Sequence, residues 1–269
     1  MKDLFKNKNF LIGFVFVSLL LSVSLISFVY TPHPPNEMNV DFRLLRPNSR
    51  FLLGTDNFGR DILSRIMVAV KTGFYVGALS TIIGFTIGVT LGAISGYLES
   101  FFDVFFSRFI DIIMTFPTVL FALMLISVLG AGFLNTVLVL GVASVPRFFR
   151  LSRSGFMQEK NLQYVKAAKM KGSNVFRIMF IHILPNTKSS IVVNISFSFS
   201  MSVMAEAGLS YLGLGVNPPH PSLGRMLQEA QPHLSSAPWY VGFTGLMVII
   251  MVLGFNLIGD GINETFNKR

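Results

Sequence analysis

Long apolar segments alternate with shorter polar ones along most of this chain. The first apolar segment, residues 10–30, carries no charged residue. As a helix it would be roughly 30 Å long, which matches the hydrocarbon thickness of a bilayer. Five further apolar segments lie near 74–97, 109–130, 133–149, 187–213 and 240–260. The pattern predicts an all-α integral membrane protein with six transmembrane helices.

The composition supports this interpretation. The 269 residues are 52% hydrophobic and 13% charged, with a mean hydropathy of +0.62, whereas soluble proteins have about 25% charged residues. The net charge of +9 could indicate a nucleic-acid partner, but in a membrane protein it more often reflects Lys and Arg in cytoplasmic loops. We therefore expect no nucleic-acid partner. The chain has no cysteine, which excludes disulfides and thiolate metal sites.

The first apolar segment follows Lys2, Lys6 and Lys8, an arrangement that signal peptides share. It is too long for a typical signal peptide, however, and no Ala-x-Ala cleavage site follows it. We expect a retained anchor with a cytoplasmic N-terminus. With six spans, the C-terminus would also be cytoplasmic.

The distribution of Lys and Arg favours the same orientation, since cytoplasmic loops are enriched in these residues. Of the 22, fifteen would be cytoplasmic and seven outside. The cytoplasmic set comprises Lys2, Lys6, Lys8, Arg108, the nine from Arg147 to Lys188, Lys268 and Arg269. The outer set comprises Arg43, Arg46, Arg50, Arg60, Arg65, Lys71 and Arg225. Six of these seven follow the first span, where Glu37, Asp41, Asp56 and Asp61 reduce the net charge.

A polar, basic segment, residues 164–186, separates the fourth and fifth spans. Ala167 and Ala168 are small helix formers, so a partner can approach that face closely. Gly172 can adopt a positive φ and end a short helix, and Pro185 suits the start of the next one. These residues predict a short helix over about 161–177, including a turn, before the next span. An amphipathic helix that contacts only lipid headgroups is the alternative.

The spacing of Ala167, Ala168, Gly172, Leu184 and Pro185 resembles the "EAA" loop of the membrane subunits of bacterial ABC importers. In that family a short cytoplasmic coupling helix of this loop docks into the ATPase. Lys166 stands where the name-giving Glu would be. Because Lys166 reverses that charge, we expect an acidic or neutral ATPase surface, with the more usual Glu supplied by the partner membrane subunit. A solvent-facing Lys166 without a role is the alternative.

Three other segments carry the resemblance further: LGTDNFGRDILSR (53–65), AEAGLSYLGLGVNPPHPSLGRML (205–227) and FNLIGDGIN (255–263). They resemble the shorter, C-type permease subunit of the dipeptide, oligopeptide and nickel ABC importers. The resemblance implies the type I importer permease fold and a bacterial cell-membrane location. It also implies a homologous second permease subunit, two ATPases that use ATP and Mg, and a solute-binding protein. No cofactor would be bound by this chain itself.

We expect a single transmembrane domain over 1–269, with an anchor at about 10–30 and a core at about 73–262. In the second span, glycines at intervals of four share one helix face and allow another helix to pack closely or to slide during gating. They are Gly84, Gly88, Gly92 and Gly96. Pro117 is expected to kink the third span, and the prolines of 216–238 predict an ordered or partly re-entrant outer loop.

Charged residues near the membrane allow more than one role. Glu206 could line the translocation path or a gate, because an intramembrane charge usually faces a cavity or a partner, or it could be a structural hydrogen-bonding group. Asp111 and Asp260 are expected near cytoplasmic helix ends, solvated or ion-paired. The arginines at 147, 150 and 153 would mainly anchor the fourth span inside or border the ATPase interface.

Signatures of enzymes and metal sites are missing from the sequence. The four histidines, at 33, 182, 220 and 233, form no helical ligand pair, and we expect no metal site, with a cluster of the three outer histidines as the alternative. There is no GxxxxGK[ST] loop and no GxSxG elbow. We therefore expect a non-catalytic subunit that works by alternating access. A secondary transporter driven by an ion gradient and an intramembrane enzyme are the alternatives. Peptides, nickel and metal–chelator complexes all remain open as substrates.

Overall fold

The computed structural model describes residues 4–267, apart from the side chains at 188, 189 and 267. Lys2, Lys268 and Arg269, which the charge distribution includes, lie outside this range, as does the side chain of Lys188. Ten α-helices make up most of the described chain. They are α1 (Lys8–Ile26), α2 (Ile62–Leu98), α3 (Phe101–Met114), α4 (Thr118–Leu129), α5 (Phe133–Glu159), α6 (Gln163–Met170), α7 (Val175–Arg177), α8 (Lys188–Tyr211), α9 (Leu223–Ala230) and α10 (Pro238–Asn267).

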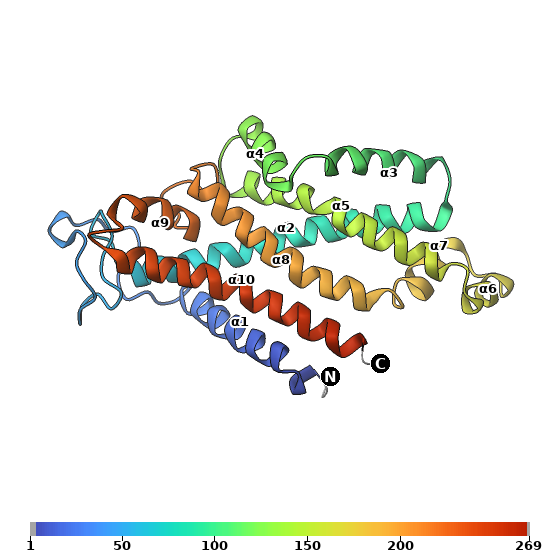
Figure 1. Cartoon of the computed structure of the whole chain (residues 1–269), viewed down its shortest axis with the longest axis horizontal. Helices are drawn as coiled ribbons and strands as arrows, with labels where there is room; N and C mark the ends of the chain where they lie inside the picture. The colour runs from blue at the N-terminus through green and yellow to red at the C-terminus, as the bar shows by residue number, and fades with distance from the viewer. Residues whose placement is uncertain (1–3, 268–269) are drawn as a thin grey trace.

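The long helices lie side by side along one common direction (Figure 1). The segment between α1 and α2 and the short helix α9 lie at one end of the bundle, on the left of the view. α6 and α7 lie at the opposite end of the bundle. The first residues of α1 and the last residues of α10 lie toward that same end. The start of α1 and the end of α10 are tied together, because the side-chain amides of Asn7 and Asn9 donate to the Glu264 carboxylate at 2.6 and 3.0 Å.

Within residues 4–267, five helices are long and apolar enough to cross a membrane: α1, α2, α5, α8 and α10. A sixth crossing requires α3 and α4 to count as one span, and these are bent by 91° at the break between them. The kink expected at Pro117 is therefore a full break, and the span expected over 109–130 consists of two helices. Pro117 has no N–H and disfavours helical geometry at Phe116, so α3 ends at Met114 and α4 starts afresh after Pro117.

Several helices run beyond the apolar segments that predicted them. α2 starts at Ile62 rather than near 74, and α5 continues to Glu159 rather than ending near 149. Hydropathy marks only the apolar part of a helix, whereas the hydrogen-bonded helix continues through the charged residues at its ends.

The glycine face of α2 lies against α5. A Cβ atom added to Gly88 would stand 2.6 Å from the Phe148 Cβ, and one added to Gly92 would stand 2.9 Å from the Ser152 Cβ. Cβ atoms added to Gly84 and Gly96 would likewise come too close to atoms of Ser144 and Arg153 in α5. No side chain fits between these backbones, so the glycines set the separation of the two helices.

A second close contact joins α1 and α10. A Cβ atom on Gly13 would stand 2.6 Å from the Gly254 carbonyl oxygen. Sequence reasoning did not single out this pair, because Gly13 is the only glycine of its apolar segment and Gly254 belongs to no stripe at intervals of four. The anchor helix is thus packed against the last helix of the chain.

The segment after α8 contains a short helix rather than an unbroken loop. α8 ends at Tyr211, Gly213 follows with φ of +80°, and α9 occupies Leu223–Ala230 within the proline-rich stretch. Met226 and Ala230 of α9 are buried in the same apolar cluster as Tyr240 of α10. The stretch is ordered as expected, and it packs on the end of the bundle.

Candidate functional site

The segment that resembles the coupling loop folds as two short helices with a glycine turn between them. Gly172 has φ of +78°, and its N–H and that of Ser173 donate to the carbonyls of Lys169 and Ala168 at 3.0 and 3.1 Å. This is a Schellman motif, which caps the end of a helix. No atom lies within 4 Å of a Cβ built on Gly172, so glycine is favoured there by its backbone conformation alone.

The two alanines of this segment point in different directions. Ala168 is buried with Val165 of α6 and with Phe156 and Ile183 from neighbouring elements. Ala167 is exposed, as are Lys166 and, at 89%, Met170. The surface that α6 offers to a partner therefore includes Ala167 but excludes Ala168, a difference that helix periodicity alone did not resolve.

The other two residues of the loop lie where the chain turns into α8. Leu184 is half-buried and packs against two apolar clusters, whereas Pro185 is exposed in the turn before the helix. Their placement connects α6 and α7 directly to α8, a helix of membrane-spanning length.

A groove with a volume of about 440 Å³ lies beside the break between α3 and α4. We refer to it as the bend groove. Its lining includes Phe116 and Thr118 from the break, Arg147 and Arg150 from α5, and Ser198 and Ser202 from α8. The groove thus brings together four helices, α3, α4, α5 and α8, and combines apolar side chains with cationic and hydroxyl groups.

The three evenly spaced arginines of α5 have separate surroundings. Arg153 forms a bidentate ion pair with Asp103 of α3, at 2.5 and 2.8 Å. Arg150 pairs with Asp111 at 2.8 Å, with both side chains about half exposed. Arg147 lines the bend groove, and no ion pair in the described part of the chain includes it. Asp111 is thus ion-paired, and the arginines serve α3 and the groove in addition to any role as anchors.

Glu206 is buried at the end of α8 and is not among the residues that line the bend groove. Its carboxylate accepts a hydrogen bond from the Ser210 hydroxyl at 2.6 Å, and that hydroxyl accepts one from the Val216 N–H at 3.1 Å. These contacts tie α8 to the segment that leads into α9. They favour the structural interpretation of Glu206, and its role in a gate stays a prediction.

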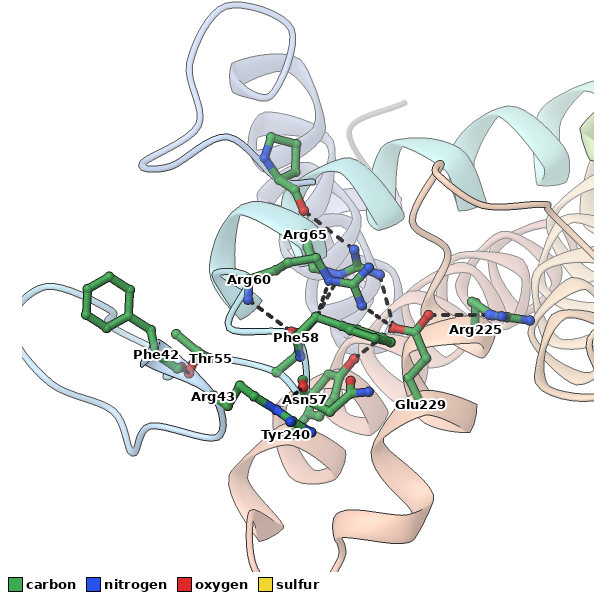
Figure 2. A network of polar contacts seen from close by, with 12 residues as sticks. Phe42, Arg43, Thr55, Asn57, Phe58, Arg60, Arg65, Arg225, Glu229 and Tyr240 are labelled. Atoms are coloured by element: carbon green, nitrogen blue, oxygen red, sulfur yellow. Dashed lines mark hydrogen bonds and ion pairs between the residues drawn. The ribbon is translucent and has the colours of Figure 1, made fainter. Parts of the chain in front are cut away.

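A buried network of charges at the opposite end from α6 was not recognised from the sequence. Figure 2 shows the Glu229 carboxylate of α9 between Arg225 and the guanidinium groups of Arg60 and Arg65. The Glu229 Oε2 atom lies 2.6 Å from a guanidinium nitrogen of Arg60 and 3.3 Å from one of Arg65. Asp56 pairs with Arg60 at 2.6 Å and with Arg65 at 3.5 Å. We call Asp56, Arg60, Arg65, Arg225 and Glu229 the outer charge network.

This network gives a structural role to three charged residues of the segment 53–65, one of the segments that resemble permeases. Asp56, Arg60 and Arg65 all come from it, and the Arg43 side chain donates to the Asn57 carbonyl at 2.7 Å (Figure 2). The signal available in the sequence was the presence of two acids and two arginines within ten residues of an otherwise apolar chain. Their partner Glu229 lies too far along the chain for such a pattern to identify.

The remaining ionisable residues predicted from the sequence are dispersed. Asp260 is exposed on α10. The His33 Nδ1 lies 3.6 Å from an Asp61 carboxylate oxygen. Within residues 4–267, no three His, Cys, Asp or Glu side chains come together as a metal site would require.

The chain is similar to known transport proteins along most of its length. Residues 88–269 match the family described as "Binding-protein-dependent transport system inner membrane component". The chain is 35% identical to the di/tripeptide transport system permease DppC of Pseudomonas aeruginosa, over 98% of this chain and 89% of that protein. It is 38% identical to the dipeptide permease DppC of Escherichia coli, over 98% and 90%. The glutathione permease GsiD of Pectobacterium atrosepticum is 37% identical, over 95% and 85%.

A solved structure shows the same fold. The MetNI methionine ABC transporter, in an inward-facing conformation, aligns with a TM-score of 0.61 at 16% identity, over 73% of this chain and 93% of that one. The fold is therefore that of an ABC importer permease, and none of these likenesses supports the ion-gradient alternative. Since the family match covers more than half of the chain and the relatives align along nearly all of it, the protein belongs to the family of binding-protein-dependent transport system inner membrane components.

Proposed function

We propose that this chain is the C-type permease subunit of an ABC importer for short peptides. The observation that carries the proposal is the similarity, along nearly the whole chain, to permeases named for dipeptides, di/tripeptides and glutathione. The cargo would be a small peptide, and nickel and metal–chelator transport has no support among the relatives described above. The chain would supply half of the translocation path and no catalytic group.

The partners follow from this role. A homologous second permease subunit would complete the path, a solute-binding protein would deliver the peptide, and two ATPases would use ATP and Mg. α6 would contact one ATPase through the exposed side chains of Ala167 and Met170, together with Phe176 of α7, which is 71% exposed. Apolar side chains so exposed at one end of a bundle favour a protein partner.

The orientation would place α6 and the chain ends in the cytoplasm. Three of the arginines that this orientation places outside, Arg60, Arg65 and Arg225, pair with Asp56 and Glu229.

The experiment is reconstitution of the chain with its second permease subunit, its ATPases and its binding protein in proteoliposomes. We expect ATP-dependent uptake of a labelled dipeptide that ceases when the binding protein is left out. Uptake that follows an imposed proton or sodium gradient without ATP would contradict the proposal, as would uptake of nickel but not of peptide. Labelling of single cysteines introduced at Ala167 and Met38 would test the orientation, since the proposal puts them on opposite sides.

A further inference from the structure

The bend groove contains a cation with no counter-charge of its own. Arg147 and Arg150 both line it, whereas among the described residues only Asp111 forms an ion pair with either of them. The next arginine of the series, Arg153, is already held by Asp103. The groove therefore has an excess of positive charge on α5, within a helix that is apolar enough to cross the membrane. Charged residues at membrane depth usually face a water-filled cavity and mark a path for substrate or ions.

The backbone at the break indicates that the groove is wet. Within residues 4–267, no backbone or side-chain donor reaches the carbonyl oxygens of Thr115 or Phe116, because the chain turns away there before α4 begins. In lipid such carbonyls would be costly, and irregular backbone is found at membrane depth only where protein covers it or water fills a cavity. Of these two residues Phe116 lines the groove, so its free carbonyl and Arg147, unpaired within the described chain, both favour an aqueous groove.

The other groups of the groove suit a small polar molecule. Ser198 and Ser202, one turn apart on α8, also line the groove, and the buried hydroxyl of Ser198 has no hydrogen-bond partner among the described residues. The volume of about 440 Å³ lies in the range of small-molecule sites. Guanidinium groups bind carboxylates through paired hydrogen bonds, and every unmodified peptide carries a C-terminal carboxylate.

We propose that Arg147, with Arg150 beside it, binds the C-terminal carboxylate of the peptide as it passes through the bend groove. This inference rests on the proposed function. The exposed Arg150–Asp111 pair would be weak, so a passing carboxylate competes with Asp111 for Arg150. Arg147 would be a specificity-determining residue of the permease, separate from the selection that the binding protein makes.

The same chemistry could come from an acidic side chain of the second permease subunit, and the experiment separates the two sources. Uptake is measured in proteoliposomes for a dipeptide with a free C-terminal carboxylate and for its C-terminal amide. Both are supplied at concentrations that saturate the binding protein, whose affinity for each is determined separately. The variants are Arg147→Gln and Arg147→Lys. The control is Arg108→Gln, an exposed arginine of α3 that does not line the groove.

We expect the ratio of free-acid to amide uptake to fall about tenfold in Arg147→Gln, as for loss of a hydrogen bond between charged groups, and to recover in part in Arg147→Lys. The control should keep the wild-type ratio. An unchanged ratio in Arg147→Gln would overturn the inference. Loss of the second permease subunit from purified Arg147→Gln would overturn it too, by assigning the carboxylate to that subunit. Failure of the wild-type complex to import either peptide would instead contradict the proposed function.

Discussion

Glu229 is the residue on which most of the outer charge network depends. Its carboxylate faces Arg60, Arg65 and Arg225 and also accepts from the Tyr240 hydroxyl at 3.4 Å. Arg65 is only 2% exposed, so its charge has little access to water. Removal of one partner from a buried ion pair leaves an uncompensated charge, and this loss exceeds the net stabilisation by the pair itself.

We therefore predict that Glu229→Ala destabilises the protein by about 3–5 kcal/mol. Glu229→Gln should cost less, because an amide oxygen still accepts a hydrogen bond. The thermal unfolding midpoint of the purified complex would be measured in detergent. Glu37→Ala is the control, since Glu37 is an exposed glutamate of the same outer segment and its loss should matter little. Equal midpoints for Glu229→Ala and the control would refute the role of the network.

Ala167 and Ala168 of α6 are adjacent in the chain but lie in opposite surroundings, so the same substitution should act differently at each. Ala167→Arg places a long cation on the exposed face of α6, so we predict loss of coupling between ATP hydrolysis and transport with the chain still folded. Ala168→Arg forces the same side chain into the cluster of Val165 and Ile178, so α6 itself should lose its packing. Proteolysis of α6 distinguishes the two variants, because only Ala168→Arg should be cleaved faster. Transport at the wild-type rate in Ala167→Arg would exclude this face from the ATPase contact.

At the scale of the elements, the packing of α2 on α5 depends on the absence of side chains. The Gly88 position lies 2.6 Å from Phe148 Cβ and 2.7 Å from the Val145 carbonyl oxygen. Both atoms belong to or adjoin the backbone of α5 and cannot turn away. The two hydroxyls that bridge the helices, from Ser80 to the Val137 carbonyl at 3.1 Å and from Ser152 to the Val89 carbonyl at 3.0 Å, also need this separation.

We predict that Gly88→Leu costs several kcal/mol, because bulk forced into a tight contact pushes the helices apart. Gly242→Leu in α10 provides the matched control, since nothing lies within 4 Å of a Cβ at that position. Heating the two variants side by side and recording the fraction that stays monodisperse would reveal the difference. If both variants behave like the wild-type protein, the helices are not held at this distance by the glycine face.

The sequence predicts those features of the helices that depend on residues close together in the chain. Apolar length located the spans, a spacing of four located the glycine face, and Gly172 marked the end of α6. The hydropathy of 109–130 could not reveal a 91° break, because a proline inside a span permits either a kink or a full interruption. The contact of Gly13 with Gly254 and the pairing of Arg60 with Glu229 join residues far apart in the chain, where no periodicity applies.

At the scale of the whole molecule, the charges near α6 determine how the chain would meet its ATPase. Lys160 is neutralised by Glu99 at 2.6 Å, and the Lys169 ammonium lies over the Tyr97 ring at 5.3 Å. Lys166 is exposed, and no ion pair among the described residues includes it. The sequence predicted a uniformly basic loop, whereas these contacts leave Lys166 as one of its free charges. A partner surface would therefore experience the charge of Lys166 more directly than that of Lys160.

The substitution Lys166→Glu restores the acidic residue usual for an EAA loop. If the ATPase surface is acidic or neutral where it meets α6, the new carboxylate should weaken assembly. The loss should be largest at low salt, because screening extends over about 30 Å at 0.01 M but only about 3 Å at 1 M. Association with the ATPases and peptide uptake would be measured across a salt series, with Lys166→Gln as the charge-neutral control. Wild-type association at every salt concentration would show that Lys166 faces solvent without a partner.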